Sequence, residues 1–133
     1  MGDATDNILI PVSPGELVDR LTILEIKSEK IADPGKRDNV LHELGLLSAA
    51  AEGIIPDNEL MRALHAELKA VNARLWQIED DIRDCERRGD FGDSFIELAR
   101  SVYRTNDRRA AIKRQINEQL GAKIQDEKSY APY

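Results

Sequence analysis

Several residue types and sequence patterns are scarce in this chain, and each scarcity excludes a structural feature or a class of function. Cys85 is the only cysteine, so no internal disulfide can form, and a reducing compartment such as the cytoplasm is expected. No apolar run approaches the ~18 residues of a membrane-spanning helix, and the acidic amino terminus differs from a secretory signal. The net charge of −6 argues against a general nucleic-acid binder, which would be basic.

Motifs for catalysis and for metal binding are also missing. His42 and His65, the only histidines, stand outside any Glu-x-x-His pair of the di-iron type. The sequence has no Gly-x-Ser-x-Gly, no phosphate-binding loop and no dinucleotide fingerprint. Cys85 falls on the apolar side of a predicted helix, which indicates a packed thiol. We therefore expect no metal site and no cofactor, assign no catalytic residue, and favour a protein that is not an enzyme, since a catalytic role would depend on the arginines alone.

What the chain does contain is helical patterning over most of its 133 residues. We expect one all-α domain, 1–133, with an extended lead-in at 1–13 and a tail at 122–133 that folds back onto the helices. Ser13, Pro14 and Glu16 indicate a capping box, Asp57 is expected to cap the third helix, and Ser94 with Glu97 indicates a second capping box. The predicted helices span 14–31, 36–51, 57–87 and 93–120.

The third helix carries the clearest pattern, an apolar seam with steps of three and four residues, typical of shallow packing on a partner helix. Its members are Met61, Leu64, Leu68, Val71, Leu75, Ile78, Ile82 and Cys85. A helix of ~31 residues is about 46 Å long, too long for a compact globule of this size. We therefore expect an elongated antiparallel hairpin of 57–87 and 93–120, with the first two helices laid end to end along one side. A homodimer would cover the remaining apolar faces.

The seam of the fourth helix turns polar midway, at Thr105, Asn106 and Arg109. A charge on an apolar seam needs a partner, and the candidates are Asp19 and Glu25 on the first helix or a second subunit. Three interpretations stay open. The polar layer fixes the register of packing and the number of partners, Arg109 lies at the edge of the seam and reaches solvent, or the layer lines a pocket for a small anion bearing phosphate or carboxylate. The residues of that anion site would be Arg109, Asn106, Arg104, Arg20 and Lys27.

A second basic feature is the face formed by Arg100, Arg104 and Arg108, which follow one another at intervals of four. The simpler interpretation is a solvated face whose arginines pair with acids of the third helix. The alternatives are an anion site for a phosphate or carboxylate, whose geometry guanidinium groups match, and a surface that docks an acidic partner protein. The acids expected opposite this face are Glu79, Asp80, Asp81 and Asp84.

Four stretches of the chain are distinctive: PVSPGELVDRLTILEIKSEKI (11–31), LWQIEDDIR (75–83), FIELARSVYRTNDRRAAIKRQIN (95–117) and EKSY (127–130). Together they resemble a family of small bacterial helical proteins of unknown function. The resemblance implies a bacterial, intracellular protein associated with surface-polysaccharide gene neighbourhoods, and it implies no activity and no catalytic residues. A fainter similarity, of residues 17–31 and 34–44 to all-helical chorismate mutases, fails because their first helix is much longer and the basic positions do not align.

The sequence thus leads to two hypotheses about function. The first is a non-enzymatic interaction or assembly module that acts as a homodimer in the cytoplasm. The alternative is a binder or enzyme for a small anionic metabolite, linked through the resemblance to surface-polysaccharide metabolism.

Overall fold

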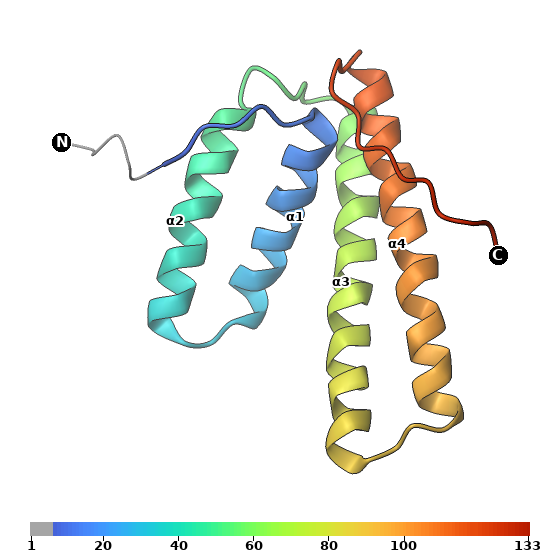
Figure 1. The fold of residues 1–133 in the computed structure, drawn as a ribbon. Coiled ribbons are helices and arrows are strands. Elements are labelled where there is room, and N and C mark those ends of the chain that lie inside the picture. Colours follow the sequence, from blue (N-terminus) through green and yellow to red (C-terminus); the bar gives the residue numbers. More distant parts are fainter. Residues whose placement is uncertain (1–6) are drawn as a thin grey trace.

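The computed structural model describes residues 7–133, and this part of the chain is all-α, as predicted, with no strand (Figure 1). The first six residues of the predicted lead-in lie outside the described residues. Residues 7–13 have no regular secondary structure. The helices are α1 (Pro14–Lys30), α2 (Pro34–Ala51), α3 (Glu59–Arg88) and α4 (Asp93–Gln119).

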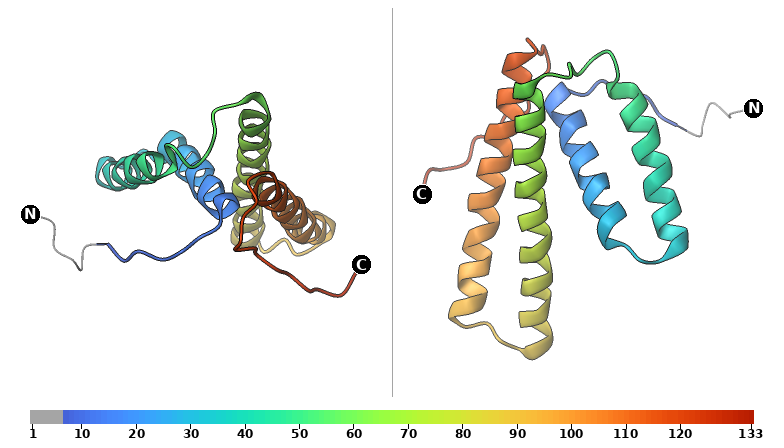
Figure 2. Two further views of the ribbon diagram at one scale, coloured as in Figure 1. Left: turned by 90° about the horizontal axis from the view of Figure 1, so that it is seen from above. Right: turned by 180° about the vertical axis from the view of Figure 1, so that it is seen from behind.

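Helix α1 is the centre of the arrangement. It packs against α2, α3 and α4, whereas α2 packs on no described helix except α1. Helices α3 and α4 run antiparallel, and α1 and α2 form a second, shorter hairpin beside them (Figures 1 and 2). The expectation that the first two helices lie end to end is therefore wrong, because the Asp33-Pro34 turn folds α2 back along α1. The closed end of the α3–α4 hairpin extends beyond the α1–α2 pair (Figure 1).

The starts of the first two helices follow their local sequence. The Ser13 hydroxyl accepts a hydrogen bond from the Glu16 amide (3.1 Å), and Pro14 occupies the first turn of α1. Asp33 caps α2 in the same way, through the Lys36 amide (2.9 Å). The predicted Ser13 cap is thus confirmed.

The caps predicted for the other two helices are wrong. Asn58 caps α3 through the Met61 amide (2.8 Å), while Asp57 forms an ion pair with Arg62 (2.6 Å). Helix α4 begins one residue before Ser94, after Gly92, and has no side-chain cap. The turn before α4 is instead closed by Asp90, whose carboxylate accepts from the Gly92 amide (3.1 Å).

The hydrophobic core lies between α1, α3 and α4. Its buried members are Val18, Met61, Leu64, Leu68, Ile112 and Ile116. Cys85 is also buried, near the closed end of the α3–α4 hairpin, as expected of a packed thiol. Helix α2 has Val40 as its single buried residue, so it is held far more lightly than the other helices.

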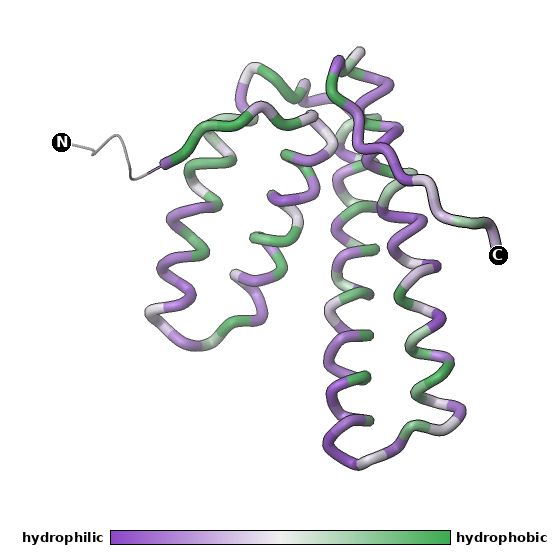
Figure 3. The backbone as a smooth tube through the Cα atoms, in the orientation of Figure 1, coloured by the Kyte–Doolittle hydropathy of each residue, from purple (hydrophilic) through white to green (hydrophobic). Residues whose placement is uncertain are grey.

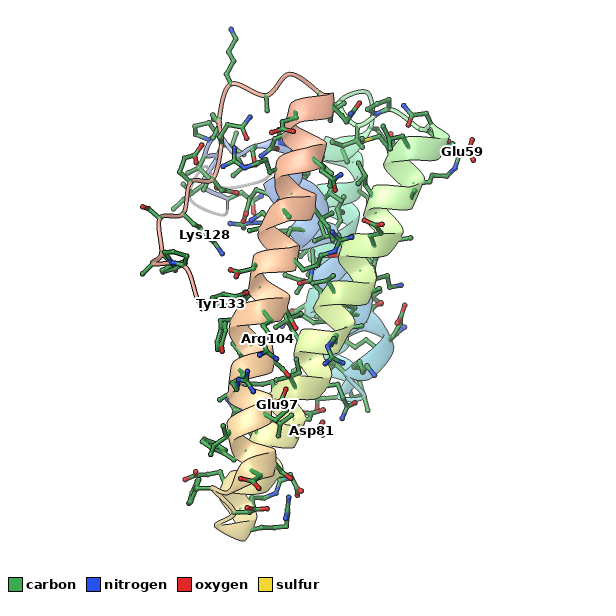
Figure 4. All side chains as sticks on the ribbon, turned by 90° about the vertical axis from the view of Figure 1, so that its right-hand side faces the viewer. Glu59, Asp81, Glu97, Arg104, Lys128 and Tyr133 are labelled. Atoms are coloured by element: carbon green, nitrogen blue, oxygen red, sulfur yellow. The ribbon has the colours of Figure 1, made fainter. Side chains whose placement is uncertain are left out.

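The carboxyl-terminal tail folds back along α4, as predicted. Arg114 pairs with Glu127 (2.8 Å), and the Tyr133 hydroxyl donates a hydrogen bond to Asp107 (2.8 Å). Figure 4 shows Tyr133 beside α4, on the side that carries Arg104. At the other end, segment 8–12 is apolar yet exposed (Figure 3).

Candidate functional site

A polar layer joins α1, α3 and α4 at the level where the seam of α4 loses its apolar residues. We define it as Asp19, Thr22, Asn72, Arg109 and Lys113. Asp19 is only 1% exposed, and its carboxylate accepts two hydrogen bonds from the Arg109 guanidinium, one of them from Nε at 2.9 Å. The Asn72 amide donates to Asp19 Oδ1 and to Thr22 Oγ1, both at 2.9 Å. Arg109, the charged residue of the α4 seam, is therefore paired within the chain. Its partner Asp19 is one of the two carboxylates that were expected on α1.

Lys113 adds a second cation to this layer. Its Nζ lies 2.7 Å from Glu16 Oε2, 3.2 Å from Asp126 Oδ2 and 3.9 Å from Asp19 Oδ2. Asp126 belongs to the tail, so the polar layer also anchors the end of the chain. Three carboxylates thus surround two cations, and the cluster has no excess positive charge to attract an anion.

The pKa values in this cluster favour the charged forms. Burial raises the pKa of Asp19, but hydrogen bonds from Arg109 and Asn72 and the nearby cations outweigh it and leave that pKa below its ordinary value. For Lys113, burial lowers the pKa, yet hydrogen bonds to Glu16 and Asp126 hold it above the ordinary value. The Asp19 carboxylate and the Lys113 ammonium therefore both stay ionised at neutral pH.

A close approach of two helices supports the polar layer at the start of α1. The Gly15 amide donates a hydrogen bond to the side-chain oxygen of Asn117 (2.7 Å), which is itself buried on α4. A Cβ at position 15 would lie 2.5 Å from the Lys113 carbonyl oxygen, so a residue larger than glycine does not fit.

The residues predicted to bind an anion are dispersed and mostly paired. Arg109 binds Asp19, Arg20 binds Glu16 (3.1 Å), and Arg104 binds Glu97 (3.4 Å). Asn106 lies elsewhere, in a cavity of about 820 Å³ between α4 and the tail that Arg109 does not line. Lys27 is half-buried on α1.

The arginine face of α4 pairs mainly within its own helix. Both Arg100 (3.1 Å) and Arg104 (3.4 Å) bind Glu97, and Arg108 reaches α3 through Glu67 (3.3 Å). The prediction that these arginines pair with acids of α3 near the closed end of the hairpin is wrong for the acids that bind arginines of their own helix. Glu79 binds Arg83, and Asp84 binds Arg87 and Arg88. Residues three or four positions apart on one helix meet at lower entropic cost than long side chains on two helices. Figure 4 shows Glu97 and Arg104 along α4, with Asp81 on α3 beside Glu97.

The sequence did not predict a groove of about 710 Å³ between α2 and α3, with α1 as its floor. We call it the α1–α2–α3 groove. It is lined by Val18, Leu21, Glu25, Leu44, Ser48, Ala51, Glu52, Ile55, Pro56, Asp57, Met61, Arg62, His65, Ala66 and Lys69. Most of these side chains are apolar, and the groove exists because α2 packs on α1 without reaching α3.

One wall of the groove carries a hydrogen bond and an ion pair between α1 and α3. His65 Nε2 donates to Glu25 Oε1 (2.6 Å), and Lys69 binds Glu29 (2.7 Å). The hydrogen bond from His65 lowers the pKa of Glu25 by more than burial raises it. Glu25, the second expected partner of Arg109, is therefore committed to His65. Forty residues separate Glu25 from His65, and no local motif signals their contact.

The described residues offer neither a metal-binding cluster nor a helix suited to a membrane. Within residues 7–133, no group of three or more His, Cys, Asp or Glu side chains is placed to hold a metal ion. None of the four described helices is both long and apolar enough to cross a membrane.

Comparison with known proteins gives a family and no activity. Residues 8–132 match the family of unknown function DUF6165, and the chain belongs to that family. No curated protein and no solved structure matches the chain significantly.

Proposed function

We propose that this protein is a non-enzymatic assembly module of the bacterial cytoplasm that acts as a homodimer. The observation that carries the proposal is the α1–α2–α3 groove, an open volume of about 710 Å³ whose lining includes Val18, Leu21, Leu44, Ile55 and Met61. An apolar groove open to solvent on a folded chain is typical of a surface that binds another molecule.

Large apolar side chains of the described residues also face solvent, on α2, in the loop after it, at the start of α3 and at the closed end of the α3–α4 hairpin. They include Leu41, Leu46, Ile54, Leu60, Phe91 and Ile96. Those next to the groove, Leu41 and Ile54, extend the apolar surface on which another protein can bind.

The anionic-metabolite hypothesis receives less support. Arg109, Arg104 and Arg20 each bind a carboxylate of the same chain, so an anion would have to displace an acidic side chain from each of them. Displacement from Arg109 would also leave Asp19 buried without its cation, which is costly.

The mass of the native protein tests the proposal. Light scattering coupled to size exclusion should give twice the 15.0 kDa chain mass, and native mass spectrometry should find no bound small molecule. A mass of one chain over the whole concentration range would contradict the homodimer. An excess of a few hundred daltons that is lost on denaturation would favour the anionic-metabolite alternative instead.

A further inference from the structure

Helix α2 has two faces, and the chain itself covers only one of them. Val40 is buried against the rest of the chain, and α1 is the one helix that α2 packs on. A second face is formed by Leu41, Leu44, Gly45 and Ser48, whose spacing of three and four residues places them together. Leu44 and Ser48 line the α1–α2–α3 groove, and Leu41 is 40% exposed.

Gly45 is the unusual member of this face. Glycine is a poor helix former, yet Gly45 lies in the interior of the 18-residue helix α2. A Cβ at this position would meet nothing within 4 Å, so packing inside the chain does not require a glycine here. Glycine at such a position permits the backbone of another helix to come close.

We propose that the α1–α2–α3 groove of each chain is filled by helix α2 of a second copy. The two α2 helices would lie antiparallel across a twofold axis near Gly45 and Ser48. Each α2 would then pack on α1 of its own chain and on α1, α2 and α3 of the other. This arrangement rests on the proposed homodimer and names its interface. Because a twofold interface is self-complementary, one contact fills both grooves and leaves no open end for further growth.

The groove suits this occupant in shape and in charge. Its floor and the base of its α3 wall are apolar, with Val18, Leu21 and Met61, as the leucine-bearing face of α2 requires. Lys69 lies at the end of the groove beside Glu25, and Glu52 lies at the opposite end, beside the loop after α2. An antiparallel α2 from a second copy would bring its own carboxyl-terminal Glu52 towards the Lys69 end. Lys69 already binds Glu29 (2.7 Å), so Glu52 would share its ammonium with a second carboxylate, as Glu16 and Asp126 share that of Lys113.

Cysteine cross-linking tests the arrangement directly. Cys85 is 2% exposed and does not interfere. Ser48→Cys should form a disulfide-linked dimer under mild oxidation, whereas Ala50→Cys, which lies on the opposite side of α2, should not. Equal cross-linking of the two variants would indicate random collisions and would overturn the inference.

A substitution at Gly45 supplies an independent test. Gly45→Arg should reduce the molar mass from two chains to one, while circular dichroism shows unchanged helix content, since the position is open in the single chain. Ala50→Arg, on the opposite side of α2 and also exposed, should leave the dimer intact. If the wild type and Gly45→Arg are both dimers and Ser48→Cys does not cross-link, the homodimer stands but uses another surface. If the wild type is a monomer, both proposals fail.

Discussion

The Asp19 carboxylate is the most deeply buried charge described in the molecule, and the hydrogen bonds and cations around it keep it ionised against the effect of burial. Removing a carboxylate and a guanidinium from water is costly, so the Asp19–Arg109 pair need not add net stability. Removing one partner alone is different, because the other then remains buried without compensation. The pair therefore fixes how α1 and α4 meet.

Loss of the cation should destabilise the fold strongly. We expect Arg109→Ala to lower the free energy of unfolding by about 3 kcal/mol, because Asp19 would keep only Asn72 and the more distant Lys113. Urea denaturation measures the change. Arg104→Ala, which breaks an exposed pair, is the control and should cost less than about 1 kcal/mol. Equal losses in the two variants would show that the buried pair has no special structural role.

The same carboxylate predicts how stability depends on pH. The pKa of Asp19 is lower in the folded chain than its ordinary value, and so is that of Glu25. The unfolded chain therefore takes up protons first as the pH falls. The stabilisation from both groups is complete above about pH 5 and is lost progressively below about pH 4. The melting temperature should fall over that acidic range, and less steeply in Asp19→Asn, which is less stable at neutral pH. A parallel fall in both proteins would exclude Asp19 as a source of the acid sensitivity.

At the scale of the helices, the contact of α1 with α4 depends on one glycine. Gly15→Ala should destabilise the protein by roughly 1–3 kcal/mol, because the new methyl group would lie 2.5 Å from the backbone oxygen of Lys113. Gly35→Ala is a matched control. Gly35 also follows the first proline of a helix, and its Cβ would meet a carboxylate oxygen of Asp33 at an ordinary 3.6 Å. Thermal unfolding should separate the two variants, and similar melting temperatures would contradict the close approach.

The helices themselves could be predicted from sequence, since local signals determine them. Helix α1 was expected at 14–31 and spans Pro14–Lys30, because Ser13 and Pro14 define its start. The caps of α3 and α4 were less predictable. Asp57 and Asn58 are both good caps, and their order alone does not say which one begins the helix. Partners across helices were harder still, because both the rotation of α1 and its shift along its own axis decide whether Asp19 or Glu25 reaches Arg109.

At the scale of the whole molecule, the sequence predicted the all-α class but not the position of α2. Apolar periodicity shows which face of a helix is buried, and it does not show which helix covers that face. Helix α1 covers only part of the apolar surface of α2, and the uncovered part forms one wall of the groove. A groove formed by an incomplete contact leaves no signal in the sequence of either wall.

The central position of α1 also has a consequence for synthesis on the ribosome. Asp19 and Arg109 are 90 residues apart, and Gly15 and Asn117 are 102 apart. At roughly 5–20 residues per second, Asp19 emerges several seconds before its cation is made. During that interval α1 and α2 can pair as a nascent hairpin, but the carboxylate must stay hydrated. Burial of Asp19 under the α1–α2 hairpin is therefore delayed until α4 has been made.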